Sequence, residues 1–294
     1  MKSLKKVLAI LLFFPRDMCY NTHKTIPIRR TIMASSALND RTQVQEQYKT
    51  AANLNTRISI HAKYSVNRQG FGNWIFAQYR LRENDRILEL GCGNGSMWSD
   101  HALPEGAELI LTDFSEGMLD SARANVGIRD GISFRQADIQ QIPYADESFD
   151  AVIANMMLYH VPDLSKALSE VRRVLKPGGS FYCATSGTNS ITEYVQGLLK
   201  DYGIRCGEGI GLSFTLQNGG DLLKEYFSEA ELRRYEDHLE VTETGDLVDY
   251  ILSLEGMADF RAVPPEELYR ILDGQKENGV IRVPKDYGMF VSVK

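Results

Sequence analysis

The sequence predicts an α/β protein with a three-layer, doubly wound sheet that is mostly parallel. From residue 86 onward, short apolar runs alternate with amphipathic helical segments, which is typical of a parallel sheet covered by helices on both faces. The 294 residues, 43% of them hydrophobic, suffice for one large domain with a substantial core. Charged residues are interspersed along the chain, so a folded globular protein is expected.

Seven segments are expected to form the strands. Helical crossovers, which are right-handed in parallel sheets, join the first five, and two of them are expected at Ser115–Asn125 and Leu164–Leu175. Pro177 and the glycines after it are expected to stop the second helix and turn the chain into the fifth strand. The last two strands can pair antiparallel at an edge. In chain order, the expected strands are 86–90, 107–112, 132–134, 149–155, 180–185, 232–244 and 286–294.

Residues 1–32 differ in charge from the rest of the chain. Seven Lys or Arg and one Asp give them +6, which leaves −12 for the remainder of a chain with a net charge of −6. Their apolar run is far shorter than the roughly 20 residues that span a bilayer. A dispensable or mis-assigned leader, with translation starting at Met33, is the first interpretation. A disordered or membrane-touching tail is the second, and a cleaved signal peptide is the third.

Two further parts are expected after this segment. Residues 33–84 are interpreted as a helical lid, because a loop rich in Asn, Gly and aromatic residues provides a hinge and apolar cover. An aromatic staple that packs the first helix on the sheet is the alternative. Residues 85–294 form the main domain, in which an insertion at about 186–230 is expected to wall the substrate site. Its aromatic residues favour an apolar or planar small molecule.

Charge and cysteine usage exclude several classes of function. The net charge of −6 argues against nonspecific binding of nucleic acid, which needs a basic surface. The four cysteines are scattered and form no C-x-x-C pair, which argues against a disulfide framework or a zinc site and favours the cytoplasm. A small-molecule partner is expected, with no nucleic acid and no stable membrane insertion, while the oligomeric state is left open.

A glycine-rich loop after the first expected strand marks the ligand site. Ligands of parallel α/β sheets bind at the C-terminal ends of the strands, and "GCGNG" follows "ILEL" directly. Gly91 and Gly93 let ligand atoms approach the main chain. Asp113 ends the second strand 22 residues after Gly91, where an acidic residue binds a ribose diol. An ordinary strand-to-helix turn is the alternative for the loop, and a helix N-cap is the alternative for Asp113.

The loop favours S-adenosylmethionine over NAD. Its third glycine, Gly95, comes one residue earlier than in the dinucleotide fingerprint. Glu89 lies just before the loop, where a carboxylate repels a diphosphate but suits a ligand that carries an ammonium and a sulfonium. An NAD-dependent oxidoreductase and a nonenzymatic S-adenosylmethionine-binding module remain the alternatives.

Four motifs between residues 85 and 185 resemble, in order and spacing, those of class I S-adenosylmethionine-dependent methyltransferases. They are closest to the small-molecule branch of the ubiquinone/menaquinone-pathway type. The resemblance implies a sheet of order 3-2-1-4-5-7-6 with the seventh strand antiparallel, and methyl transfer by in-line displacement. The motifs are "ILELGCGNG", "LTDFSEGML", "QADIQQIPYADESFDAVIANMMLYHV" and "EVRRVLKPGG".

The resemblance also implies roles for single residues. Asp113 binds the ribose, Phe114 lies against adenine, Asp138 accepts the adenine amino group beside the amide of Ile139, and Asn155 lies near the sulfonium. Plain core packing is the alternative for Phe114 and Ile139. The expected cofactor-binding residues are Tyr64, Glu89, Gly91, Cys92, Gly93, Asp113, Phe114, Met118, Asp138, Ile139 and Asn155.

His160, with Tyr159 beside it, is the expected general base. The two residues follow the fourth strand, in a loop that faces the methyl group in the family geometry, and histidine titrates near neutral pH. The alternative is a histidine that only hydrogen-bonds the backbone where a helix begins. The sequence contains no Ser-His-Asp order and no metal-binding cluster, so none is expected.

Overall fold

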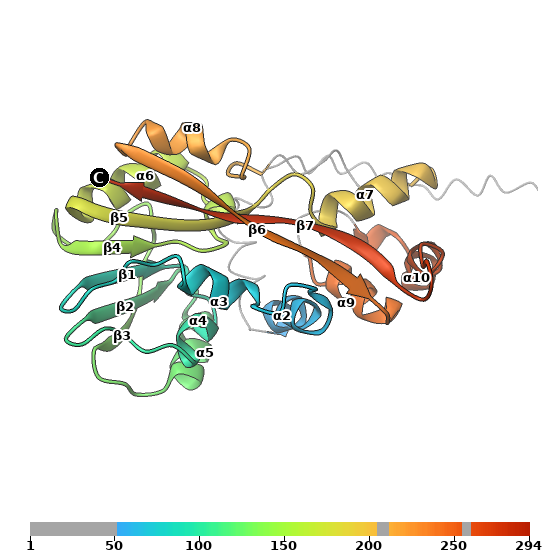
Figure 1. Ribbon diagram of the computed structural model, residues 1–294, viewed down its shortest axis with the longest axis horizontal. Coiled ribbons are helices and arrows are strands. Elements are labelled where there is room, and N and C mark those ends of the chain that lie inside the picture. The colour runs from blue at the N-terminus through green and yellow to red at the C-terminus, as the bar shows by residue number, and fades with distance from the viewer. Residues whose placement is uncertain (1–51, 205–211, 255–259) are drawn as a thin grey trace, which may run out of the picture. The chain divides into compact units, whose positions relative to one another are not determined.

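The computed structural model describes residues 52–204, 212–254 and 260–294, and the structural statements below concern these ranges. Seven strands form one sheet in the order β3-β2-β1-β4-β5-β7-β6 (Figure 1). β7 is antiparallel to both of its neighbours, and the other pairs are parallel. The predicted sheet is therefore confirmed. The strands are β1 (Arg86–Leu90), β2 (Glu108–Asp113), β3 (Ile132–Gln136), β4 (Phe149–Ile153), β5 (Leu175–Ser186), β6 (Glu229–Val241) and β7 (Ile281–Val293).

Helices cover both faces of this sheet. Side-chain caps begin several of them; for example, Ser115 Oγ accepts from the amide of Met118, and Asp163 Oδ1 accepts from the amide of Lys166. The helices are α2 (Ala52–Tyr64), α3 (Phe71–Phe76), α4 (Ser96–Ser99), α5 (Glu116–Val126), α6 (Leu164–Val174), α7 (Ile191–Asp201), α8 (Gly219–Lys224), α9 (Thr244–Leu252) and α10 (Pro265–Asp273), with single 3-10 turns at η1 (Leu158–His160) and η2 (Phe260–Ala262).

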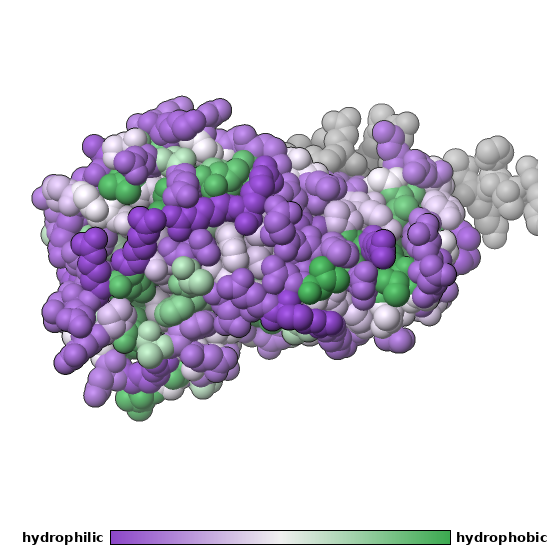
Figure 2. All heavy atoms as spheres, viewed as in Figure 1, coloured by the Kyte–Doolittle hydropathy of each residue, from purple (hydrophilic) through white to green (hydrophobic). Residues whose placement is uncertain are grey.

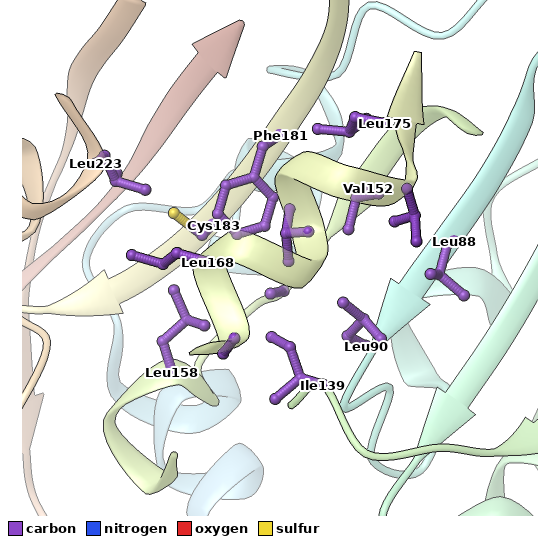
Figure 3. Packing of buried hydrophobic residues seen from close by; sticks show 14 of the residues in the cluster. Leu88, Leu90, Ile139, Val152, Leu158, Leu168, Leu175, Phe181, Cys183 and Leu223 are labelled. Atoms are coloured by element: carbon purple, nitrogen blue, oxygen red, sulfur yellow. The ribbon is translucent and has the colours of Figure 1, made fainter. Parts of the chain in front are cut away.

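The central strand β1 shows how the two faces are packed. Because successive side chains of a strand point to opposite faces, Leu88 and Leu90 pack in the cluster that includes α6 (Figure 3). Ile87 packs in the other cluster with Trp98 of α4. Glu89 shares the face of Ile87, so its carboxyl group is buried among apolar side chains next to the loop that follows.

One expected turn lies within a strand instead. α6 ends at Val174 and β5 begins at Leu175, so the Lys-Pro-Gly-Gly segment is part of β5. The pairing of β5 with β4 shifts register between Leu175 and Ser180, and Gly178 has a φ of 74°. A bulge accommodates a proline that a regular inner strand excludes. The prediction that this segment forms a turn before the strand is therefore corrected.

β6 and β7 extend beyond the strands that form the rest of the sheet. β7 pairs with β5 only from Tyr287 to Val293, whereas its earlier residues pair with β6 alone. Figure 1 shows this part of the hairpin among α2, α7, α9 and α10. These elements bury a second apolar cluster that includes Ile60, Leu239 and Ile251. This cluster packs behind the wall that α2, α7, α9 and β7 form in the cavity described below.

A buried ion pair fastens the segment after α2 to the hairpin. Lys285 Nζ lies 2.6 Å from Asp237 Oδ2, and neither side chain is exposed. The amide of Asn67 donates to Asp237 Oδ1 at 3.0 Å, and Lys285 Nζ donates to Ser65 Oγ at 3.1 Å. The pair therefore joins β6 and β7 to the connection between α2 and α3.

The surface is mostly polar in the view of Figure 2, where apolar side chains gather only in small separate patches. Within residues 52–204, 212–254 and 260–294, no helix combines the length and the hydropathy that crossing a membrane requires.

Candidate active site

A cavity of about 460 Å³ lies at the C-terminal ends of the central strands. Its near side is formed by the loops that follow β1, β2, β3 and β4, and its far side by α2, α7, α9 and β7. This volume lies within the roughly 300–1,000 Å³ typical of small-molecule sites. Eleven of the thirteen residues expected from the sequence line it: Glu89, Gly91, Cys92, Gly93, Asp113, Phe114, Asp138, Ile139, Asn155, Tyr159 and His160.

The glycine loop passes closely between neighbouring elements. Gly91 and Gly95 have φ values of 71° and 70°, in the left-handed region that favours glycine. A Cβ atom at Gly91 would lie 2.9 Å from the side chain of Met157, and one at Gly95 would lie 2.9 Å from that of Val126. Both positions therefore need glycine for packing as well as for conformation.

Asp113 holds the loop to the end of β2. Its Oδ2 accepts from the amide of Gly93 at 2.9 Å and its Oδ1 from the amide of Ser115 at 2.8 Å. Burial raises the pKa of Asp113 to about 6, against the effect of these amides. Ser115, rather than Asp113, caps α5. Because a carboxylate oxygen can accept more than one hydrogen bond, Asp113 retains capacity for two hydroxyl donors.

Glu89 adds a second buried acidic group to the near side. The side chain is 3% exposed, and the indole N–H of Trp98 donates to Oε2. Burial raises the pKa of Glu89 to about 7, and the neighbouring Asp113 acts in the same direction. Among the described residues, no Lys or Arg forms an ion pair with either carboxyl group. This side of the cavity therefore suits a cationic ligand and disfavours a diphosphate.

Asn155 uses its side chain to fix the end of β4. Its Nδ2 donates to the hydroxyl of Tyr79 at 2.7 Å, and its Oδ1 accepts from the amide of Ala184 at 3.3 Å. Met156 follows with a φ of 53°, which is uncommon for a residue with a side chain and occurs preferentially at functional sites. Met156 and Met157 both line the cavity; they lie within the third motif but were not among the expected site residues.

Asp138 and Ile139 lie in the connection between β3 and β4. Asp138 Oδ1 accepts from the amide of Gln140 at 2.9 Å. Ile139 is 6% exposed and belongs to the cluster that contains Leu90 (Figure 3), so core packing accounts for its side chain. Its backbone amide is a separate group, so the interpretation of that amide as a ligand contact stays open.

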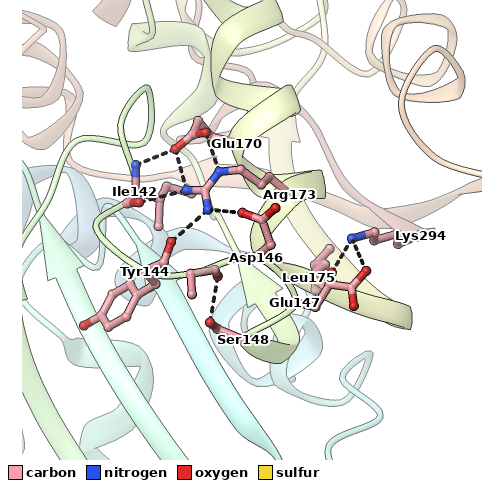
Figure 4. A network of polar contacts seen from close by, with 10 residues as sticks. Ile142, Tyr144, Asp146, Glu147, Ser148, Glu170, Arg173, Leu175 and Lys294 are labelled. Atoms are coloured by element: carbon pink, nitrogen blue, oxygen red, sulfur yellow. Dashed lines mark hydrogen bonds and ion pairs between the residues drawn. The ribbon is translucent and has the colours of Figure 1, made fainter.

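Arg173 fixes the next part of this connection to α6 (Figure 4). Its guanidinium donates to the carbonyl oxygens of Ile142 at 3.0 Å and Tyr144 at 2.8 Å, and to the carboxylates of Glu170 and Asp146. Glu170 in turn accepts from the amide of Ile142 at 2.9 Å. The connection therefore does not depend on a ligand for its position.

Tyr159 and His160 lie in η1, directly after β4. The amide of His160 donates to the carbonyl of Met157 at 2.9 Å. The two rings are 4.6 Å apart and tilted by 58°. Both side chains line the cavity, Tyr159 being buried and His160 partly exposed. They therefore lie where an acceptor beside the cofactor would be expected.

Two of the expected cofactor residues do not line the cavity. The hydroxyl of Tyr64 donates to Asp246 Oδ2 at 2.5 Å, at the start of α9. Met118 is 1% exposed and packs inside α5. The expected lid segment contributes Phe71 to the cavity lining, whereas Arg68 is exposed and outside the lining. Tyr64 and Met118 therefore have other roles in this geometry and are left out of the proposal below.

The far side of the cavity contains residues that the sequence did not indicate. They come from elements as far apart in the sequence as Leu54 and Tyr287 and belong to no local motif. Part of the 186–230 insertion also lines the cavity. Within the described ranges, no group of three or more His, Cys, Asp or Glu could hold a metal ion. The far-side residues are Leu54, Arg57, Ile58, His61, Tyr250, Leu254 and Tyr287, with Ser186, Ser190, Thr192, Glu193 and Leu212 from the insertion.

Residues 88–183 match a family model described as a methyltransferase domain. The chain is 39% identical over 134 residues to the ubiquinone/menaquinone biosynthesis C-methyltransferase of Pectobacterium carotovorum, with 41% of this chain and 53% of that relative covered. The chain thus spans about half the length of this curated relative.

Solved structures share the fold. A Bacillus halodurans protein assigned as a methyltransferase has a TM-score of 0.54 at 21% identity, covering 76% of this chain and 98% of its own. The [4+2]-cyclase SpnF has a TM-score of 0.52 at 16% identity, covering 86% and 96%. At these identities only the fold is shared. Residues 88–183 therefore match a methyltransferase domain, and the sheet order is the one that the resemblance to the class I S-adenosylmethionine-dependent methyltransferases implies.

Proposed function

We propose that this protein transfers a methyl group from S-adenosylmethionine to a small-molecule acceptor by in-line displacement. The observation that carries the proposal is the near side of the cavity, where the glycine loop meets the buried carboxyl groups of Glu89 and Asp113. S-adenosylmethionine supplies a methyl group on a positively charged sulfur. The protein then has to bind that cation, align the acceptor and exclude water, which together can supply about 7–11 kcal/mol.

Each near-side residue has a role in this proposal. Asp113 accepts hydrogen bonds from the two ribose hydroxyls, and Phe114 lies against adenine. Asp138 accepts from the adenine amino group, beside the amide of Ile139. Glu89 stabilises the positive charge of the methionine part. The backbone of the glycine loop and that of Asn155 complete this part of the site.

The affinity for S-adenosylmethionine is expected to rise about tenfold between about pH 6 and pH 8, because the cation prefers the ionised form of Glu89, whose pKa is about 7. Glu89→Gln is expected to flatten this dependence. The pKa of Glu89 is higher in the folded protein than in the unfolded chain, so ionisation of Glu89 destabilises the folded, ligand-free protein. Glu89→Gln should therefore also raise Tm at pH 8. Calorimetry and thermal unfolding measure both effects, with exposed Glu116→Gln as the control. A steep profile that persists in Glu89→Gln would contradict this role.

The acceptor side supports a planar or apolar small molecule. Methionine and aromatic side chains are among the lining residues, and the Pectobacterium relative is named for ubiquinone and menaquinone biosynthesis. His160 acts as general base for an acceptor that begins protonated, with Tyr159 packed against it. The unpaired thiols of Cys92 and Cys183 support a cytoplasmic location.

His160→Gln is expected to lower turnover about 100-fold, the lower range of general-base contributions, while the affinity for S-adenosylhomocysteine is unchanged. Steady-state rates and calorimetry separate the two effects. His238→Gln, which changes a histidine paired with Glu240 outside the cavity lining, is the control. Unchanged turnover in His160→Gln would remove this residue from the mechanism.

The proposed activity is tested by incubating the protein with S-adenosylmethionine that carries a ¹³C methyl group and with a metabolite extract. The expected result is S-adenosylhomocysteine together with an equal amount of label in a small product, both lost in Asp113→Ala. Binding of S-adenosylhomocysteine without transfer of label would favour a nonenzymatic binding module. Calorimetric uptake of NAD but not of S-adenosylhomocysteine would favour an oxidoreductase.

A further inference from the structure

The segment that joins β5 to α7 brings polar side chains to the far side of the cavity. Ser186 ends β5, Ser190 caps α7, and Thr192 and Glu193 lie in the first turn of that helix. All four residues line the cavity. α7 lies beyond the C-terminal ends of β4 and β5 (Figure 1). The segment therefore places hydroxyl groups and a carboxylate beside the apolar and aromatic side chains that α2, α9 and β7 contribute.

Ser190 holds the carboxylate of Glu193 in place at this wall. The amide of Ser190 donates to Glu193 Oε2 at 3.3 Å, and the hydroxyl of Ser190 donates to the same oxygen. This arrangement is a capping box, in which a side chain of the first turn reaches back to the residue that caps the helix. Glu193 is partly exposed, and no group of the described residues donates to its Oε1. One carboxylate oxygen is therefore available to a ligand.

The protein does not neutralise the charge of Glu193 within the described ranges, where no Lys, Arg or His forms an ion pair with it. Among the described lining residues, Arg57 is the only Lys or Arg. Arg57 lies one turn after Leu54, whose side chain is 3.3 Å from the position of a Cβ atom on Gly93, so its charge lies toward the glycine loop. A ligand that lies against α7 therefore meets a negative charge.

The hydroxyl of Thr192 adds a second polar group to this wall. Thr192 is 5% exposed, and its Oγ1 has no hydrogen-bond partner in the part of the chain that the structure describes. Fully covered side-chain atoms that lack a partner occur at four other residues of these ranges, so Oγ1 of Thr192 retains accessible surface. Buried polar groups are nearly always hydrogen-bonded, so an unpartnered hydroxyl in a cavity lining indicates a partner that the ligand supplies.

This wall adjoins the place proposed for the methyl acceptor. The amide of Ala184 in β5 binds Asn155 at the end of β4, and Ser186 follows two residues later. Farther along the insertion, Ser213 Oγ donates to the carbonyl oxygen of Tyr159 at 3.4 Å. In the proposed complex, the insertion therefore lies between the end of β4, where the methyl group is presented, and η1.

We propose that Glu193, together with the hydroxyl of Thr192, binds a hydrogen-bond donor on the methyl acceptor and excludes acceptors that carry a carboxylate there. A hydroxyl or ammonium group gains a charge-assisted hydrogen bond with Oε1, whereas an anion meets a like charge. The substrate class is thus an apolar molecule with one donor group. This inference rests on the proposed function, because α7 borders an acceptor site only if the near side binds the cofactor.

The test uses 2-naphthylmethanol, 2-naphthylmethylammonium and 2-naphthoate, which share one apolar body and carry a neutral donor, a cationic donor and an anion. Each is titrated by calorimetry into protein saturated with S-adenosylhomocysteine. The wild type is expected to bind both donors at least about tenfold more tightly than 2-naphthoate, because like charges in contact are strongly disfavoured. The relative affinity of the two donors shows whether a hydroxyl or an ammonium suits the site better.

Glu193→Gln removes the charge but keeps a side chain that completes the capping box. This variant is expected to bind 2-naphthoate about tenfold more tightly than the wild type does, and the ammonium about tenfold more weakly. Thr192→Val is expected to weaken 2-naphthylmethanol several-fold, because it removes one neutral hydrogen bond. Glu116→Gln, which changes an exposed carboxylate paired with Arg123, should change none of the three affinities. Glu193→Ala serves the same comparison if Glu193→Gln lowers Tm.

The outcomes separate the two proposals. S-adenosylhomocysteine could bind while the wild type shows no preference for the donors or binds none of the three probes, or while the Glu193 variants keep the wild-type preference. Any of these results overturns the role of Glu193 and leaves the proposed function standing. Unchanged binding of 2-naphthylmethanol in Thr192→Val removes Thr192 from the proposal. If folded wild-type protein does not bind S-adenosylhomocysteine, the proposed function fails, and the inference fails with it.

Discussion

Asp113→Ala is expected to weaken the binding of S-adenosylhomocysteine about 1,000-fold. The ribose diol loses two charge-assisted hydrogen bonds of about 2 kcal/mol each, and about 1.4 kcal/mol corresponds to a factor of ten. The amides of Gly93 and Ser115 also lose their acceptor, which loosens the glycine loop. Calorimetry of the folded variant measures the effect.

Two variants sharpen this experiment. Asp120→Ala removes an exposed carboxylate of α5 that pairs with Arg123, and should leave the affinity unchanged. Asp113→Asn keeps an acceptor for the loop but removes the charge, so an intermediate loss is expected. Wild-type affinity in Asp113→Ala would show that the ribose does not bind at the end of β2.

Asp237→Asn is expected to lower the free energy of unfolding by about 3–5 kcal/mol, the cost of leaving a buried charge without its partner. Burial acts against the charge of Asp237, but Lys285 and the amide of Asn67 hold the pKa of this carboxyl below its ordinary value. Losing the carboxylate leaves the Lys285 ammonium buried without a negatively charged partner among the described residues, beside the hydroxyl of Ser65 and the surrounding aromatic rings. Denaturant unfolding measures the loss.

The double variant Asp237→Leu/Lys285→Met separates pairing from packing. Because it removes both charges, it is expected to recover much of the stability lost in Asp237→Asn. Asp221→Asn, which breaks an exposed pair with Lys224, should leave the unfolding midpoint unchanged. If Asp237→Asn unfolds like the wild type, the pair does not hold the α2–α3 connection.

The sheet could be predicted because the residues that mark each strand and its end are neighbours in the sequence. The inner parallel strands contain short apolar runs, and residues that can bind a ligand follow these strands at the end of the sheet where all parallel strands terminate. From these positions the sequence predicted that Asp113, Asn155 and His160 surround one site. In the structure all three line one cavity. The bulged start of β5 was missed, because Pro177 and the glycines that follow it serve equally well in a turn and in a bulge.

The lid segment and the 186–230 insertion were expected to cover the site, but the individual far-side residues could not be predicted because nothing local marks them. His61, Tyr250 and Tyr287 meet only when the β6–β7 hairpin extends past the sheet and α2 and α9 pack on it. Tyr64 is the reverse case, since this expected cofactor residue lies outside the cavity lining. Tyr64 lies one turn after His61 on α2, but its hydroxyl donates a hydrogen bond to Asp246. Which of two residues one turn apart faces the cavity depends on the rotation of the helix about its axis.

The most direct test of the central claim is a crystal structure of the protein with S-adenosylhomocysteine. The account predicts both ribose hydroxyls within hydrogen-bond distance of the Asp113 carboxylate, and the sulfur between the end of β4 and the far side that contains His61. S-adenosylhomocysteine bound elsewhere, or bound in the cavity with its ribose away from Asp113, would contradict it.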